Sequence, residues 1–232
     1  ISNKGQRVGS MYSFREETEM VKGLVDAGFD IVSVANNHSF DYGVQAFSDT
    51  LSRLEEKNLA FVGGVFSQEQ DPLFIHQVED TTVGFLAYTN AGSPYWQASE
   101  SIAGVGWVDY DNINKVEDEI AKAKEQVDIL FVSIHAGTEY QTEPNEFQQL
   151  FSHTAINAGA DMVIGHHPHV VQKIEQYKEG WIAYSLGNFI FDQPFSKETM
   201  EGLLIKVIVE DKKIQEVIPI PTYLTPEFQV TL

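Results

Sequence analysis

Apolar residues in the first 170 positions alternate between helical spacing and short continuous runs. Helical spacing predicts helices, and continuous apolar runs without strict alternation predict strands that are covered on both faces. The same order, a helix and then a strand, occurs three times. The predicted helices begin near Met20, Ile113 and Thr142, with Gly28 as the C-cap of the first, and the strands cover 29–35, 129–134 and 162–164.

Each of these three strands leads to histidine. The first is followed by Asn37 and His38, and the second stops at His135. The third runs into the segment GHHPHVVQ, which holds His166, His167 and His169. Strands that alternate with helices pair in parallel through right-handed crossovers, so their carboxyl ends share one edge of a sheet. Because open α/β sheets bind ligands at that edge, we expect these histidines to be neighbours at a functional site.

The remaining pattern extends an α/β fold. A further helix is predicted over 43–58, a long loop over 90–107, and a hairpin turn at DKK, residues 211–213. With no linker or low-complexity stretch, we expect one domain over residues 1–232. The other predicted strands are 60–62, 82–89, 181–191, 202–210 and 214–221.

Composition narrows the possible functions. Fifteen Lys and Arg against 34 Asp and Glu give a net charge of −19, which disfavours nucleic acid and anionic membrane surfaces as partners. The absence of cysteine excludes disulfides and zinc-thiolate sites. No apolar stretch reaches the ~18 residues of a membrane span. Since the chain starts at Ile1 rather than Met, we expect any anchor or targeting segment to lie upstream.

The histidine-bearing strand ends have the chemistry of a divalent metal site. Imidazole, amide and carboxylate groups together suit Mn, Fe, Zn or Ni. The step from His167 to His169 can turn two imidazoles toward one point, with Pro168 stiffening the loop and holding His167 extended. His135 would add a third nitrogen, and Asn37 an amide oxygen.

His38 is left to act on substrate. Next to a ligand at Asn37, it can serve as a general acid or bind an oxyanion. Asp41 either orients His38 or caps the following helix, and the sequence leaves both open. His76 and His153 are predicted to be exposed or packed, without function.

Four ordered motifs resemble the CapA family of bacterial capsule-synthesis proteins, which is associated with poly-γ-glutamate. They are DAGFDIVSVANNHSFDYG, HAGTEY, GADMVIGHHPHVVQ and YSLGNFIFDQ, and the resemblance extends to about Gln193. The family is similar to the calcineurin-like metallophosphoesterases. The resemblance implies that fold, with layered sheets and flanking helices, its first strand being absent from this chain.

The resemblance also implies roles for individual residues. Asn37 matches a metal-ligating asparagine, and His38 matches the histidine that protonates the leaving group. His135 matches a lone histidine ligand, and the final ligand pair is matched by His167 and His169, with His166 as a rival for one of the two places. Glu139, Asn188 and Asp192 lie in family motifs without an assigned role.

Two departures from the phosphoesterase pattern affect the expected chemistry. Ser39 stands where phosphoesterases carry an acid, so Asp41 is the candidate to orient His38. The two acidic motifs that precede these residues in the superfamily are absent. We therefore expect an incomplete metal centre in this chain alone.

The resemblance implies a capsule poly-γ-glutamate synthesis or export component, on the extracellular face of the bacterial membrane and anchored by a segment outside this chain. An active metal-dependent phosphoesterase of unknown substrate is the alternative, and an inactive scaffold is the second alternative. The expected partners are an anionic polymer or a phosphorylated substrate, together with membrane proteins of capsule synthesis, and no nucleic acid.

Overall fold

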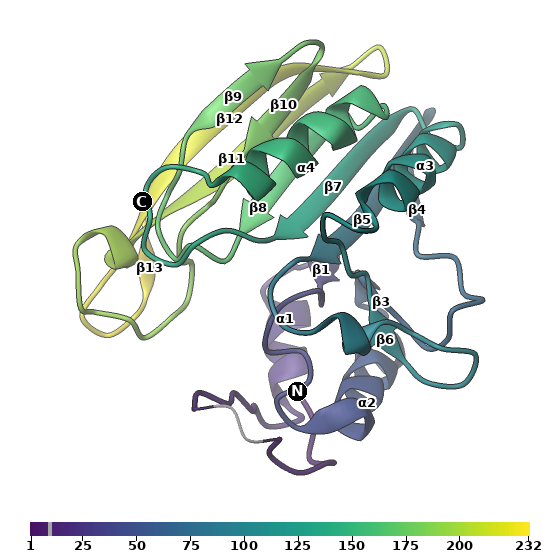
Figure 1. The fold of residues 1–232 in the computed structure, drawn as a ribbon. Helices are drawn as coiled ribbons and strands as arrows, with labels where there is room; N and C mark the ends of the chain where they lie inside the picture. Colours follow the sequence, from purple (N-terminus) through teal and green to yellow (C-terminus); the bar gives the residue numbers. More distant parts are fainter. Residues whose placement is uncertain (9–10) are drawn as a thin grey trace. The chain divides into compact units, whose positions relative to one another are not determined.

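The computed structural model describes residues 1–8 and 11–232. These residues form two compact units (Figure 1). Unit 1 comprises Ile1–Phe74 with Leu86–Asp109, and unit 2 comprises Ile75–Phe85 with Tyr110–Leu232. The expectation of one domain over residues 1–232 stays a prediction. Over the described ranges, no helix combines the length and hydrophobicity needed to span a membrane.

Unit 1 is built from short strands and two helices. Its two small sheets are the parallel pair β1–β2 and the antiparallel pair β3–β6. The elements of unit 1 are α1 (Met20–Asp26), β1 (Ile31–Ser33), α2 (Gly43–Glu56), β2 (Ala60–Val62), β3 (Gly64–Val65), the 3₁₀ turn η1 (Pro94–Trp96) and β6 (Gly104–Val105).

Helix α2 contributes four buried apolar side chains to the core of unit 1. Phe47, Leu51 and Leu54 recur at helical spacing and are buried, as the amphipathic pattern predicts. Phe47 and Leu51 pack with Phe40 and residues of the loop that leads into β6. A Cβ on Gly63, where φ is 77°, would come within 2.6 Å of the Ala35 side chain, so only glycine lets these segments approach.

Unit 2 carries the larger sheet, in which the strand order is β4-β5-β7-β8-β10-β9. A second sheet has the order β11-β12-β13. The elements are β4 (Phe74–Val78) and β5 (Thr81–Thr89), which each reach into unit 1, α3 (Ile113–Lys124), β7 (Ile129–His135), α4 (Glu146–Asn157), β8 (Met162–His166), β9 (Ile174–Tyr177), β10 (Gly180–Ala183), the 3₁₀ turn η2 (Glu198–Met200), β11 (Glu201–Glu210), β12 (Lys213–Leu224) and β13 (Val230–Thr231).

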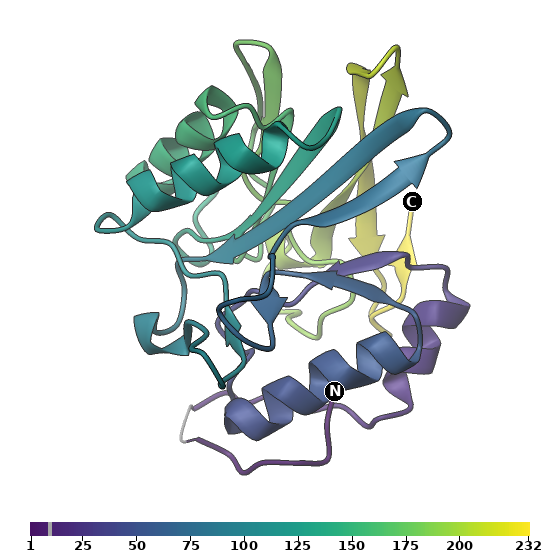
Figure 2. The ribbon, with the colours of Figure 1, turned by 90° about the vertical axis from the view of Figure 1, so that its right-hand side faces the viewer.

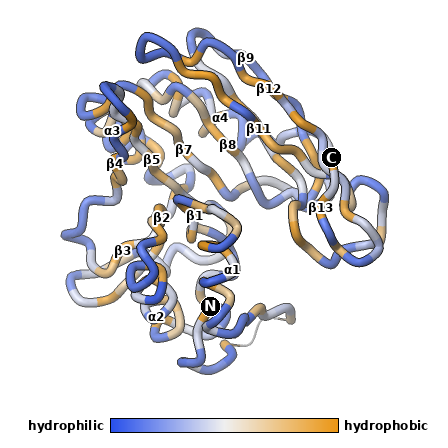
Figure 3. The backbone as a smooth tube through the Cα atoms, turned by 180° about the vertical axis from the view of Figure 1, so that it is seen from behind, coloured by the Kyte–Doolittle hydropathy of each residue, from blue (hydrophilic) through white to orange (hydrophobic). Residues whose placement is uncertain are grey.

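Unit 2 has the layered arrangement that the sequence predicted. Helices α3 and α4 lie on one side of the six-stranded sheet, and the β11–β12 hairpin lies on the other (Figure 2). Strands β7, β8 and β10 pair in parallel. Strands β7 and β8 are among the hydrophobic stretches of the backbone (Figure 3). Because both of their faces are covered, Leu130, Val163 and Ile182 are fully buried.

The β7–β8 register aligns two of the predicted strand ends. His135 and His166 are Cα partners at the carboxyl end of this parallel pair, as expected. Strand β1, by contrast, pairs with β2 in a separate two-stranded sheet, so the prediction that all three histidine-bearing strands share one sheet is wrong for the first. At three residues, β1 is too short to form an extended ladder.

Two further expectations need correction. Helix α4 is capped by Asn145 rather than Thr142, because Asn145 and Gln148 form a reciprocal capping box. The strand predicted over 181–191 ends at Ala183, because the chain bends at Tyr184. Farther on, Leu186 and Gly187 form isolated bridges to Val171 and Gly202, and Gly187 has a φ of 68°. The residues that follow Gly187 form a loop instead of extending the sheet.

Candidate functional site

The loop after β1 holds His38 against Asp41. The Nδ1 atom of His38 lies 2.8 Å from the Asp41 Oδ2 atom, and since a carboxylate only accepts, Nδ1 carries the proton. In the neutral ring Nε2 is then an acceptor, and the Asn37 Nδ2 atom lies 3.3 Å from it. Asp41 therefore orients His38, which was one of its two predicted roles.

Asp41 does not cap helix α2, its other predicted role. The N-cap is Tyr42, and no side-chain cap hydrogen bond is formed there. The carboxylate is only 6% exposed and also accepts from the Phe14 backbone N–H over 2.8 Å. Two donors thus hold one carboxylate oxygen in place beside His38, whose side chain is 31% exposed.

Ser39 stabilises the backbone that presents His38. Its hydroxyl lies 2.5 Å from the Val34 carbonyl oxygen and accepts from the Asn36 N–H over 3.2 Å. The Asn36 side chain in turn accepts from the His38 N–H over 2.8 Å. The residue that departs from the phosphoesterase pattern is therefore a loop-fixing residue, and the acidic partner of His38 comes from Asp41.

In unit 2, three of the predicted histidines lie near one another. His135 ends β7, and its ring centroid is 4.8 Å from that of His167, which follows β8. The centroids of His167 and His169 are 6.2 Å apart. The structure therefore brings His135 and His167 into direct contact, with His169 farther from His167 than His135 is.

The backbone that carries these histidines is in an uncommon conformation. His167 has a φ of 102° and His169 a φ of 61°, so the expectation that Pro168 holds His167 extended is wrong. A residue other than glycine held at such a backbone angle costs about 1–3 kcal/mol of stability. It persists only where the surrounding structure fixes it. Here the Tyr140 N–H donates to the Pro168 carbonyl over 2.8 Å. Strained non-glycine residues cluster at functional sites, and the metal-binding role of this loop stays a prediction.

Asn188 fixes the ring of His169. The Asn188 Nδ2 atom donates to the Thr199 carbonyl over 2.9 Å, so its Oδ1 atom is the acceptor that lies 2.9 Å from His169 Nδ1. Nδ1 therefore carries the proton, and Nε2 of the neutral ring has the lone pair that a metal or a donor would use. The aromatic rings of Tyr140 and Phe191 stack on His169 at centroid distances of 5.9 and 5.2 Å.

His166, the rival ligand, lies in a different environment. Burial lowers the pKa of His166 to about 4, so its ring is neutral at pH 7. His135 makes a ring contact with His167, at a centroid distance of 4.8 Å. Which of His166 and His167 would act as a ligand stays a prediction.

The imidazole and amide groups of this site are of the kind that bind a divalent metal, but among the described residues too few of them lie together to form a complete site. Within residues 1–8 and 11–232, no group of three or more His, Cys, Asp or Glu side chains is placed to hold a metal ion. Catalytic zinc sites typically use three protein ligands. The histidines as they stand do not fit a complete centre, and the ligand roles of Asn37, His135, His166, His167 and His169 stay predictions.

Three residues of the unit 2 cluster were not predicted as site residues. Asn188 lies in the motif YSLGNFIFDQ, to which no role was assigned. What distinguishes it in the structure is that its amide is buried, at 7% exposure, at the start of an irregular loop. Tyr140 has a φ of 64° and Phe191 follows Asn188 by three positions. Their contacts with His169 depend on how the loops fold over it, which hydrophobic spacing does not encode.

Solved structures share the fold of this chain. A putative 5'-nucleotidase from Staphylococcus aureus, solved in complex with α-ketoglutarate, matches with a TM-score of 0.59 and 19% identity over 91% of this chain and 41% of its own. An NAD nucleotidase from Haemophilus influenzae matches with a TM-score of 0.54 and 12% identity over 92% and 45% of the two chains. The chain thus has a metallophosphoesterase-like α/β fold, as predicted.

Sequence comparison defines the family more narrowly. The profile of the bacterial capsule synthesis protein family PGA_cap matches residues 1–193, and the chain belongs to this family. The PGA biosynthesis protein CapA of Bacillus subtilis is 36% identical over 190 residues, 81% of this chain and 49% of the relative. The capsule biosynthesis protein CapA of Bacillus anthracis is 34% identical over 215 residues, 90% and 51%. The chain spans about half the length of these relatives.

Proposed function

We propose that this chain is a domain of an accessory protein for capsule poly-γ-glutamate synthesis. The observation that carries the proposal is the family match over residues 1–193, supported by the CapA relatives at 36% and 34% identity. Because the relatives are about twice as long, the proposal concerns the region of the relatives that this chain matches. The location that goes with this role is the bacterial cell surface, anchored by a segment outside this chain, with membrane proteins of capsule synthesis as partners.

A domain exchange in Bacillus subtilis tests this role. The matching half of CapA would be replaced by this chain in a strain that lacks CapA, and secreted poly-γ-glutamate would be measured. We expect the chimera to restore polymer. A chimera that is folded and present at the cell surface yet makes no polymer contradicts the proposal.

Contact with the polymer itself requires cations. The net charge of −19 repels a polyanion such as polyglutamate, and divalent cations that bridge carboxylates remove this repulsion. Binding of polyglutamate to the isolated chain should therefore appear with Mg²⁺ or Mn²⁺ and disappear with a chelator. Binding that is indifferent to the chelator contradicts this form of the proposal.

For the unit 2 cluster, we propose weak binding of a single divalent ion. His135 and His167 lie in contact, and the Nε2 lone pair of His169 is available because Asn188 occupies Nδ1. When bound, such an ion supplies Lewis-acid chemistry at this edge. Elemental analysis after dialysis should give less than one metal per chain, and two tightly bound metals per chain would contradict this.

Phosphoester hydrolysis is the second candidate function. It is favoured by the pairing of His38 with Asp41, because a carboxylate on Nδ1 fixes the ring and directs Nε2 toward substrate for proton transfer. The test is a panel of phosphomonoesters and phosphodiesters with Mn²⁺. If the chain hydrolyses any of them, His38→Gln should lose about 10²-fold or more in kcat, with exposed His76→Gln as the control. No hydrolysis under any condition favours a scaffold without catalysis.

A further inference from the structure

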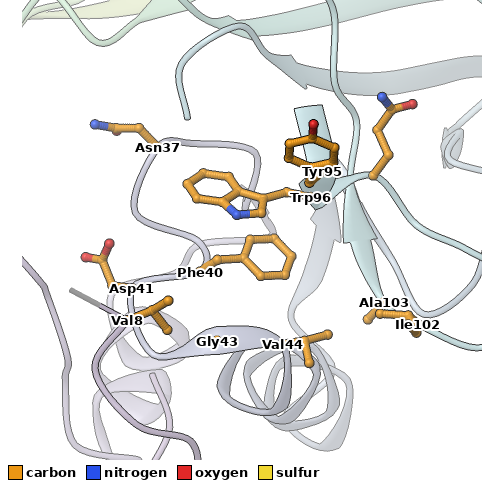
Figure 4. A pocket seen from close by; sticks show the side chains of 11 residues that line it. Val8, Asn37, Phe40, Asp41, Gly43, Val44, Tyr95, Trp96, Ile102 and Ala103 are labelled. Atoms are coloured by element: carbon orange, nitrogen blue, oxygen red, sulfur yellow. The ribbon is translucent and has the colours of Figure 1, made fainter. Parts of the chain in front are cut away.

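Unit 1 has a pocket of about 420 Å³ whose lining comes entirely from its own residues. This volume lies within the range of small-molecule sites. In Figure 4, Trp96 lies above Phe40, Asn37 and Asp41 lie at one side, and Val44 and Ile102 lie on the other. The pocket thus combines an aromatic floor with a polar end.

Trp96 is packed against neighbouring residues in this pocket. Its ring stacks on Phe40 at a centroid distance of 5.2 Å and an interplanar angle of 21°, and Phe40 in turn stacks on Phe47 at 4.6 Å. A Cβ on Gly92 would lie 2.1 Å from the indole, so the backbone at this glycine packs directly on the ring. A fixed indole loses little conformational entropy when a ligand stacks on it.

The rim of the pocket exposes large apolar side chains. Tyr95 is 94% exposed, Val8 66%, Ile102 51% and Val44 39%. Single exposed apolar residues are ordinary, but four that line one hollow are typical of a binding site. The Tyr95 ring is carried by the short η1 turn, which the Ser93 side chain caps by accepting from the Tyr95 N–H over 3.3 Å.

The polar residues of the lining define the ligand further. Asn37, Asp41 and Gln97 are hydrogen-bonding side chains, and the described lining contains no Lys, Arg or His. Nothing in this described lining neutralises an anion, while Asp41 and the overall charge of −19 repel one. The Asp41 charge is already engaged by two donors, His38 Nδ1 and the Phe14 N–H, which disfavours a cation as its main partner.

We infer that this pocket binds an uncharged sugar ring. A pyranose has an apolar C–H face, which packs on the negative face of an indole or phenol ring, and hydroxyls at its edge, which amides and carboxylates bind. The rings of Trp96 and Tyr95 supply the aromatic surface for the C–H face. The side chains of Asn37, Asp41 and Gln97 supply the hydrogen-bonding groups for the hydroxyls. The sugar is either a free saccharide or one unit of a glycan chain. The inference does not depend on the proposed role in capsule synthesis.

Titration calorimetry tests the inference with defined probes. N-acetylglucosamine and methyl glucoside represent free saccharides, and chitotetraose represents a neutral glycan chain. Glucuronate, oligo-glutamate and choline are the charged comparators. We expect the neutral probes to bind more tightly than any charged probe, and tighter binding of chitotetraose than of N-acetylglucosamine assigns the site to a glycan chain.

Two variants locate the binding. Tyr95→Ala should leave the fold intact, because this side chain is almost fully exposed, and Trp96→Phe preserves the stack on Phe40. Each should weaken sugar binding by up to about tenfold, the worth of one aromatic contact. Tyr223→Ala, a half-exposed tyrosine on β12, is the matched control and should leave binding unchanged. Absence of sugar binding, preference for a charged probe, or sugar binding unaffected by both variants overturns the inference.

Discussion

The Nδ1 atom of His169 donates a hydrogen bond to the Oδ1 atom of Asn188 over 2.9 Å. Asn188 is 7% exposed, and its amide is itself fixed by donation to the Thr199 carbonyl. This chain of hydrogen bonds sets the tautomer of a histidine whose backbone φ is 61°. A residue outside the predicted ligand set thereby determines which nitrogen of His169 is available.

Replacing Asn188 should change the tautomer of His169. Asn188→Leu removes the acceptor, and we expect Nδ1–H and Nε2–H forms of the neutral ring to become mixed, as measured from ¹⁵N shifts of the histidine ring. Asn188→Asp keeps an acceptor and should retain the Nδ1–H form. Asn157→Leu, an exposed asparagine on α4, is the control. A single Nδ1–H tautomer in Asn188→Leu would show that other groups set it.

Loss of the Asp41 carboxylate should destabilise the loop that presents His38. Asp41→Ala leaves the His38 Nδ1–H and the partly buried Phe14 N–H without this acceptor, which should cost about 1–3 kcal/mol in urea unfolding. Asp26→Ala is the control, because this carboxylate is 59% exposed and pairs with the exposed Lys22, so the change should stay below about 1 kcal/mol. Equal effects of the two substitutions would contradict a structural role for Asp41.

Gly137 should tolerate no side chain. Its φ is 128°, and a Cβ would lie 2.7 Å from the buried Gln148 Oε1 atom and 2.9 Å from Pro168 Cγ. Gly137→Ala should therefore destabilise the chain by about 1–3 kcal/mol and disturb the histidine loop. Gly23→Ala is the control, since nothing in the described chain lies within 4 Å of its Cβ position in α1, and it should be neutral or stabilising by up to about 1 kcal/mol. Equal unfolding midpoints for the two variants would refute this.

Asp49 should make stability depend on acid pH. Burial raises the pKa of this carboxyl, but hydrogen bonds from Lys4, Ser2 and Arg53 outweigh burial and hold the pKa below its ordinary value of 3.8. A carboxyl with a lowered folded pKa stabilises the protein above that ordinary value and loses the contribution as pH falls below it. Asp49→Asn should thus unfold more easily than wild type at pH 7. The difference should shrink below about pH 4, and a constant difference across pH would contradict the assignment.

The sequence predicted the parts of unit 2 that rest on periodicity. Continuous apolar runs located β7 and β8, and their parallel pairing followed from the intervening helix, so the hydrophobic pattern alone was enough to expect His135 and His166 at one edge. The turn at residues 211–213 was likewise predicted, and Asp211 and Lys212 have the positive φ of a tight hairpin. These features depend on local spacing or on neighbouring elements.

Features set by distant contacts were not predicted. The predicted strand over 181–191 was too long because residues 189–191 are apolar. At Gly187 the chain lies so close to the Glu201 carbonyl that a Cβ would be 2.7 Å from its oxygen, a contact that local sequence does not encode. The positive φ of His167 opposes the local preference of a residue before proline, and tertiary hydrogen bonds override that preference. Asn188 acquires its role through His169, 19 positions earlier. Such pairings are fixed only when the loops fold.

The most direct test of the central claim is polymer output from histidine variants of the chimeric CapA in Bacillus subtilis. We propose that this chain supports poly-γ-glutamate synthesis and that this role requires the contacting pair His135 and His167. We predict that His135→Ala and His167→Ala chimeras, present at wild-type levels, lose most of the secreted polymer, while His76→Ala retains it. Full polymer from both cluster variants would contradict the account.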